Sequence, residues 1–151
     1  MVITMAYPAA PRKYFVKLST DGSEPFLVDR TLVGDLLKIL RDQSEISDFF
    51  VWAYCFMPDH LQLLVEGRCR GADMSRFLSG FKRRSDWLFR QRRRRRLWRQ
   101  DCRKLALKEA DPILSVARFI FENPVRRGIV HRFTDYDLLG SFELNVKYMF
   151  M

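Results

Sequence analysis

Cysteine and long hydrophobic runs are both scarce in this chain of 151 residues. Its three cysteines, Cys55, Cys69 and Cys102, form no Cys-x-x-Cys pair. The sequence therefore predicts neither a disulfide framework nor a structural zinc site, and this cysteine usage fits a reducing cytoplasm. No apolar run approaches the ~18 residues that a membrane span requires. Because the N-terminal residues also lack the pattern of a signal peptide, we expect a cytoplasmic protein.

Acidic residues are few in one segment of the chain. Between Arg68 and Lys104 there are 15 Lys and Arg residues and three acidic residues. The remainder of the chain holds 12 Lys and Arg residues and 15 acidic residues. The whole excess behind the net charge of +9 lies in that segment, which contains five consecutive arginines at 92–96. Concentrated arginine indicates a polyanionic partner such as nucleic acid. The alternative interpretation is a solvated helix face or a basic loop.

The remaining composition is that of a folded globule. Hydrophobic residues make up 48% and aromatic residues 14% of the chain, and we expect a single domain over residues 1–151. Apolar periodicity predicts one strand near 14–19, a helix over 31–41, and a hairpin of two strands at 49–56 and 60–66.

Two further helices are predicted in the second half of the chain. Asp73 is the expected N-cap of the first. The second is expected to begin with Asp111 as N-cap and Pro112 as first helical residue, and to end near Asn123 because Pro124 follows. This order of elements predicts an α+β fold, with helices packed on one face of a small antiparallel sheet.

The segment MPDHLQLLV at 57–65 carries the most specific chemical signal. Side chains alternate along a strand, so His60 and Gln62 point to the same face. Both can ligate a metal ion. Taken alone, however, a His-x-Gln pair on a strand is more often a hydrogen-bonded structural pair.

This segment resembles the signature of the HUH single-strand DNA endonucleases, and in particular the MPNHxHLL strand of the REP-associated tyrosine transposases. The resemblance implies a ferredoxin-like core with a basic helical insertion and a C-terminal helix. It also implies Mg²⁺ or Mn²⁺ held by the strand residues, here His60 and Gln62. Because Gln62 replaces the family's second histidine with an uncharged ligand, any such site should be weak.

A second resemblance lies in residues 118–130, RFIFENPVRRGIV, which are similar to the family block YIxxNPVxxGxV. It implies that Asn123 is the third metal ligand and that position 119 is the nucleophile that forms a 5′-phosphotyrosine. This chain has Phe119 there, which has no hydroxyl and cannot attack a phosphate. Tyr136, and equally Tyr54, is a weak candidate to replace it.

Together the two motifs predict a protein of the transposase family that recognises hairpin-forming single-stranded DNA. The ancestral nicking and joining activity is expected to be impaired. A non-catalytic DNA- or RNA-hairpin-binding regulator is the alternative, and the sequence does not choose between a monomer and a homodimer. The residues expected to contact nucleic acid are Lys82, Arg83, Arg84, Arg92, Arg93, Arg94, Arg95, Arg96, Trp98, Arg99, Arg126 and Arg127.

Overall fold

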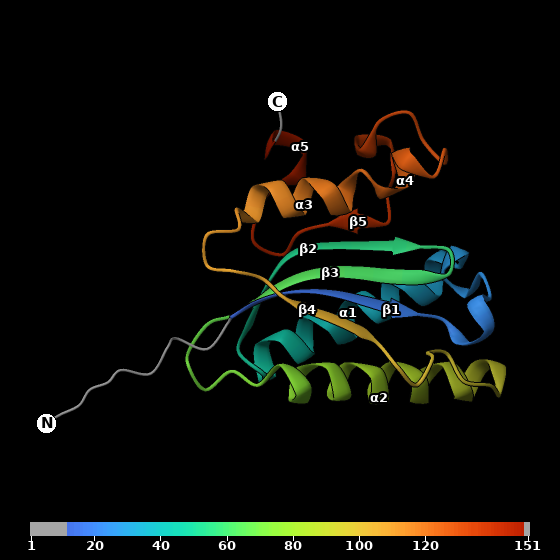
Figure 1. The fold of residues 1–151 in the computed structure, drawn as a ribbon. Helices are drawn as coiled ribbons and strands as arrows, with labels where there is room; N and C mark the ends of the chain where they lie inside the picture. The colour runs from blue at the N-terminus through green and yellow to red at the C-terminus, as the bar shows by residue number, and fades with distance from the viewer. Residues whose placement is uncertain (1–11, 150–151) are drawn as a thin grey trace, which may run out of the picture.

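The computed structural model describes residues 12–149, which form a five-stranded antiparallel sheet with helices on both faces (Figure 1). The strands lie in the order β4-β1-β3-β2-β5. Their bounds are Lys13–Ser19 for β1, Phe49–Met57 for β2, His60–Gly67 for β3, Arg103–Ala106 for β4 and Leu139–Gly140 for β5.

The helices are unequal in length. Two long ones, α1 and α2, precede the shorter α3, and single turns α4 and α5 follow near the C-terminus. Their bounds are Arg30–Ile46 for α1, Met74–Arg93 for α2, Ile113–Phe121 for α3, Asn123–Arg126 for α4 and Val146–Met149 for α5. None of the helices within residues 12–149 combines the length and the apolar composition needed to cross a membrane.

The chain order β1-α1-β2-β3-α2-β4, with β1 and β3 side by side in the centre, is the ferredoxin-like arrangement. The predicted α+β class and antiparallel sheet are therefore confirmed. Both strands of the predicted hairpin are present, and the register pairs Met57 with His60 across the turn. Pro58 lies in this turn, where its missing N–H removes no ladder hydrogen bond.

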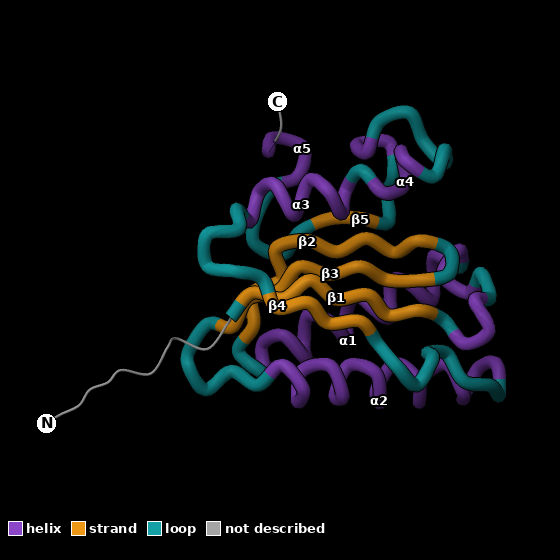
Figure 2. The backbone as a smooth tube through the Cα atoms, in the orientation of Figure 1, coloured by secondary structure: helices purple, strands orange, loops and turns teal. Residues whose placement is uncertain are grey.

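The two faces of the sheet carry separate layers of helices. Helices α1 and α2 cover one face, whereas α3 lies on the other, over β2 and β3 (Figures 1 and 2). The prediction of helices on one face is thus right for α1 and α2 and wrong for α3. Helix α3 lies apart because Ala117, Ile120 and Phe121 are buried with Ala53 and Cys55 of β2, in a second apolar cluster.

Local capping explains where the helices begin and end. The Asp73 carboxylate accepts hydrogen bonds from Ser75 N and Arg76 N at 3.0 and 3.3 Å, which confirms the predicted N-cap of α2. Helix α2 ends where Arg94 adopts a left-handed conformation at φ 53°. The N-cap of α3 is Pro112, one residue later than predicted, because the Asp111 carboxylate accepts from Lys108 N instead.

Strand β4 was not predicted. It lies in the basic segment between α2 and α3 and pairs with β1, so that Leu105 is opposite Phe15 and Arg103 is opposite Lys17. All four residues of β4 are exposed. Apolar alternation is absent here because the strand is at the edge of the sheet and its α3-facing side is open.

Candidate functional site

His60 begins β3, directly after the β2–β3 turn, and its side chain is buried on the face that carries α3. The imidazole Nδ1 donates to the Asp59 carboxylate at 2.8 Å, and Nε2 accepts from Asn123 Nδ2 at 3.2 Å. Burial lowers the pKa of His60, and the charges of Lys17 and Arg127 lower it further against the opposing effect of Asp59. The lowered pKa and these two contacts favour the neutral imidazole, with both ring nitrogens hydrogen-bonded.

Gln62 lies two residues along β3 on the same face, as predicted, and is 8% exposed. Its carbonyl oxygen Oε1 is buried and has no hydrogen-bond partner. Its cross-strand neighbours are Lys17 on β1 and Cys55 on β2. Burial raises the pKa of the Cys55 thiol to about 12, which makes it an inert core residue.

Asn123 reaches this centre from the opposite layer. It is the first residue of α4, and Pro124 follows it at the start of that turn. The change from α3 to α4 turns the Asn123 side chain into the protein, where it is buried against His60. The three residues expected to ligate a metal are thus buried on one side of the sheet, with His60 and Asn123 in direct contact.

The charges of this centre do not suit a divalent cation. Mg²⁺ and Mn²⁺ prefer carboxylate oxygens, but the three side chains are uncharged. In residues 12–149 no three His, Cys, Asp or Glu side chains form a group that could hold a metal ion. Lys17 and Arg127 add positive charge beside His60. Only the orphaned Gln62 oxygen would gain a partner from a cation, so the residues fit a tightly held metal poorly.

Phe119 lies at the edge of this centre, on the open side of α3, and 55% of its side chain is exposed. Its ring packs edge-on against Phe15 of β1, with ring centroids 6.5 Å apart. The Arg126 guanidinium lies over the Phe119 ring at 4.1 Å from the centroid, and Nη2 donates to the Phe119 carbonyl at 2.8 Å. The position of the implied nucleophile therefore holds an accessible aromatic ring without a hydroxyl.

Tyr136 does not replace the missing hydroxyl in this geometry. Its phenol donates to the Phe56 carbonyl at 2.5 Å, and burial raises its pKa to about 12. A phenol with a raised pKa and an engaged proton is a poor nucleophile. Tyr54 has its pKa raised by burial as well, and its ring packs against Phe56 and Phe142.

The arginine run divides into structural and free side chains. Arg92 pairs with Asp35 of α1, and Arg93 and Arg95 lie over the Phe26 ring at 5.7 and 4.8 Å. The side chains of Arg94 and Arg96 are exposed and make no hydrogen bond or ion pair within residues 12–149.

The other residues predicted to contact nucleic acid also include some that line an accessible pocket and some that are held by contacts within the protein. Arg83, Arg96 and Arg99 line one basic pocket beside α2. Lys82 also lines this pocket and donates to the Arg99 and Gln100 carbonyls at 2.9 and 3.0 Å. Arg84 is held by Asp42 and Gln43 of α1.

Trp98 is a core residue, which corrects the prediction that it contacts nucleic acid. Its side chain is 2% exposed, and its indole N–H donates to Ser85 Oγ at 2.7 Å. The ring also packs against Phe81. A buried indole cannot stack on an unpaired base. The exposed tryptophan of this region is Trp87 on α2.

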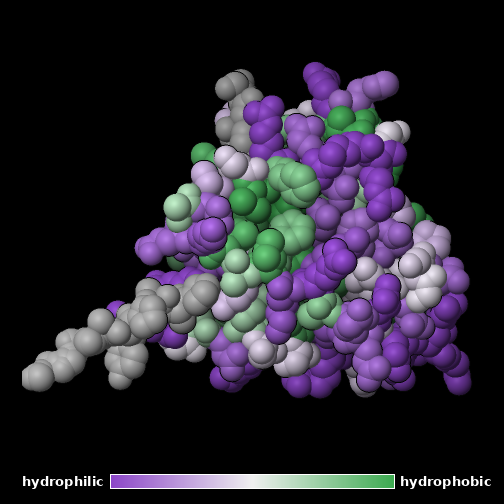
Figure 3. Space-filling model, viewed as in Figure 1, coloured by the Kyte–Doolittle hydropathy of each residue, from purple (hydrophilic) through white to green (hydrophobic). Residues whose placement is uncertain are grey.

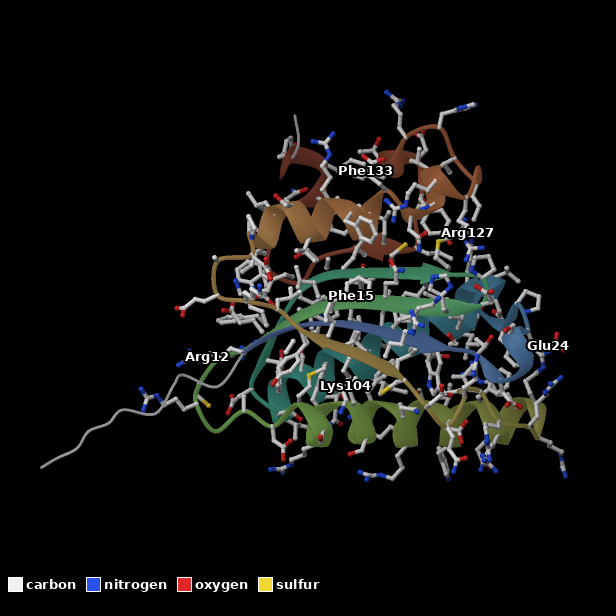
Figure 4. The ribbon with its side chains drawn as sticks, in the orientation of Figure 1. Arg12, Phe15, Glu24, Lys104, Arg127 and Phe133 are labelled. Carbon is white, nitrogen blue, oxygen red and sulfur yellow. The ribbon has the colours of Figure 1, made fainter. Side chains whose placement is uncertain are left out.

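Sequence reasoning missed Lys17, Phe15 and Arg103, all of which face the same side of the sheet as Gln62. Their signal was present in the alternation of YFVKLS, where Phe15 and Lys17 share a face. Figure 4 shows Phe15 over the sheet below α3, and Arg127 at the end of the sheet that carries the β2–β3 turn.

No family model and no curated protein matches this sequence. Solved structures do share its fold. A REP-associated tyrosine transposase bound to a REP hairpin superimposes with a TM-score of 0.76 at 15% identity, covering 98% of this chain and 87% of that one. A putative transposase from Deinococcus radiodurans R1 gives 0.56 at 18% identity, covering 84% of this chain and 98% of that one. The predicted resemblance is therefore confirmed for the fold.

Proposed function

We propose that this protein binds hairpin-forming single-stranded DNA and does not form a covalent tyrosine intermediate. Two supports are independent of each other. The fold is shared with a transposase that is bound to a REP hairpin. The charge of the chain is concentrated in a basic segment whose free arginines are exposed and available to phosphates.

The observation that carries the proposal is the position of the basic segment relative to His60. Arg93 and Arg95 lie over Phe26, and the neighbouring Leu27 N–H donates to the carbonyl of Pro58, in the turn that leads into His60. Further along the basic segment, Arg99 N donates to the carbonyl of Ser19, and Ser19 is paired with His60 across the sheet. The basic segment and the histidine therefore share one end of the sheet.

The chemical part of the proposal rests on residue types. A phosphotyrosine intermediate needs a hydroxyl at position 119, where this chain has a phenylalanine. Mg²⁺ and Mn²⁺ prefer carboxylate ligands, and His60, Gln62 and Asn123 are neutral. If Mg²⁺ or Mn²⁺ binds here, these three side chains would hold it weakly and it would polarise a bound phosphate. The proposal therefore assigns binding, not strand transfer, to this chain.

The test is a salt series of hairpin affinities with two matched double variants. Arg94→Gly with Arg96→Gln removes two free charges, and glycine suits the left-handed backbone at position 94. Arg70→Gln with Arg76→Gln removes the same charge from the other end of α2, where Arg70 precedes the helix and Arg76 lies about 27 Å from Arg94 by helix rise. The first variant should reduce the slope of log affinity against log salt by roughly 1.4 to 1.8, and the second should leave it unchanged.

Equal slopes for the first variant and the wild-type protein would refute the role of the arginine run. The same titration with an RNA hairpin of identical sequence separates the alternative partner. Tighter binding of the RNA at every salt concentration would indicate contacts with the 2′-hydroxyl groups. The proposed ligand would then be RNA and not DNA.

A further inference from the structure

Building on the proposed hairpin binding, we infer that Phe119, Phe15 and Leu105 form a stacking platform for an unpaired nucleobase next to the hairpin. Phe119 occupies the position of the implied nucleophile, and its ring is more than half exposed at 55%. Phe15 supports it from β1, and Leu105 is 60% exposed beside Phe15 on β4. Figure 3 shows hydrophobic residues gathered on this side of the molecule, between α3 and the strands below it.

The open half of the sheet explains why this platform is accessible. Helix α3 covers β2 and β3, so the α3-facing side of β1 and β4 stays open. Cross-strand neighbours in an antiparallel sheet point to the same face. The register places Leu105, Phe15 and Leu64 in one row across β4, β1 and β3. The result is an apolar row that leads from the solvent to the core.

The next row on the same face is basic. It consists of Arg103, Lys17 and Gln62, two residues further along the three strands. Two residues along a strand span about 6.7 Å, a separation that the base and phosphate of one nucleotide can bridge. Within residues 12–149, the side chains of Lys17 and Arg103 make no hydrogen bond or ion pair. Both cations are therefore free to contact a phosphate while the base lies on the aromatic row.

Arg126 prepares the Phe119 ring for this role. Its guanidinium lies on the ring at 4.1 Å from the centroid and is fixed by the hydrogen bond to the Phe119 carbonyl. A cation on the ring adds to stacking, and aromatic rings interleaved with arginine are typical of single-strand binding sites. Charge complementarity thus selects single-stranded nucleic acid over an apolar partner as the occupant.

The experiment compares three fluorescently labelled DNA probes in anisotropy titrations. One is a bare hairpin, the second carries a four-nucleotide unpaired extension at either end, and the third carries abasic sites in that extension. The variants are Phe119→Ala, Phe119→Trp and the control Leu114→Ala. Leu114 is 51% exposed on α3 but lies about 140° around the helix from Phe119.

Phe119→Ala should weaken binding of the extended hairpin by about tenfold and leave the bare and abasic probes unchanged. Phe119→Trp should retain wild-type affinity, and Leu114→Ala should behave as wild type. A 2-aminopurine in the extension should be quenched by stacking in the wild-type complex but not in the Phe119→Ala complex.

The two proposals fail in different ways. Failure of the wild-type protein to bind any hairpin would refute the proposed function. Wild-type binding of the bare hairpin with no gain from the extension would refute the platform alone. Equal affinities of Phe119→Ala and wild type for the extended probe would also refute it. A change in oligomeric state on Phe119→Ala, without loss of affinity for the extended probe, would reassign the patch to contact between two copies.

Discussion

Asn123 Nδ2 donates to His60 Nε2 at 3.2 Å, which joins the short helical turn after α3 to the first residue of β3. Because both groups are buried, this contact satisfies a nitrogen that would otherwise lack a partner. It also fixes the ring tautomer, since Nδ1 donates to Asp59. The resemblance implies that this pair ligates a metal ion, and in the structure the two side chains are hydrogen-bonded to each other.

Asn123→Ala should destabilise the protein by about 1 to 3 kcal/mol, because it leaves His60 Nε2 buried without a partner. Urea unfolding monitored by circular dichroism measures the change. The exposed carboxamide of Gln91 on α2 provides the control, and Gln91→Ala should stay within about 0.5 kcal/mol of the wild-type protein. An equal, small effect of both substitutions would show that the buried contact contributes nothing to stability.

Stability should fall as the pH drops below about 6.5, the ordinary pKa of histidine. Burial holds the pKa of His60 below that value in the folded state, so the unfolded chain takes up the proton first. Unfolding then gains protons, and its free energy decreases from about pH 6.5 down to the folded pKa. Unfolding curves of the wild-type protein and of His60→Gln should differ in this slope. If His60→Gln kept the wild-type dependence on pH, the lowered pKa of His60 would be wrong.

Mn²⁺ should raise the melting temperature of the wild-type protein only slightly, because the three candidate ligands are neutral and lie beside two cations. Gln62→His should give a larger shift at the same Mn²⁺ concentration, since a second imidazole is a stronger ligand than a carboxamide. Differential scanning fluorimetry with and without a chelator measures both. A large shift in the wild-type protein would overturn the conclusion that the residues fit a metal poorly.

Tyr136→Phe should cost about 1 kcal/mol of stability, through loss of the hydrogen bond to the Phe56 carbonyl. It should leave hairpin affinity unchanged, because the phenol is committed to the core. The exposed Tyr148→Phe is the control and should change neither quantity. Loss of hairpin processing in Tyr136→Phe alone would identify Tyr136 as a substitute nucleophile.

The elements with strong periodicity could be predicted from the sequence. The β2–β3 hairpin and the Asp73 cap were found because apolar alternation and capping are local signals. The shared face of His60 and Gln62 followed from strand geometry for the same reason. Strand β4 was missed because it is an exposed edge strand, stabilised by pairing with β1 and not by burial of its own side chains.

The remaining features of the site depend on tertiary contacts. In the sequence Trp98 lies among arginines, which suggests a contact with nucleic acid. In the structure its burial depends on its contacts with Ser85 and Phe81 of α2. The division of the arginine run into structural and free side chains depends in the same way on Asp35 and Phe26, which lie far away in sequence. Charge runs alone do not reveal such partners.

The most direct test of the account is an incubation of the wild-type protein with 5′- and 3′-labelled single-stranded DNA hairpins and Mn²⁺. The reaction is divided between a native gel and a denaturing protein gel. The account predicts a shifted band on the native gel and no labelled protein on the denaturing gel, because Phe119 has no hydroxyl to join to the DNA. A covalent adduct would contradict the account, and peptide mapping would then identify the residue that carries it.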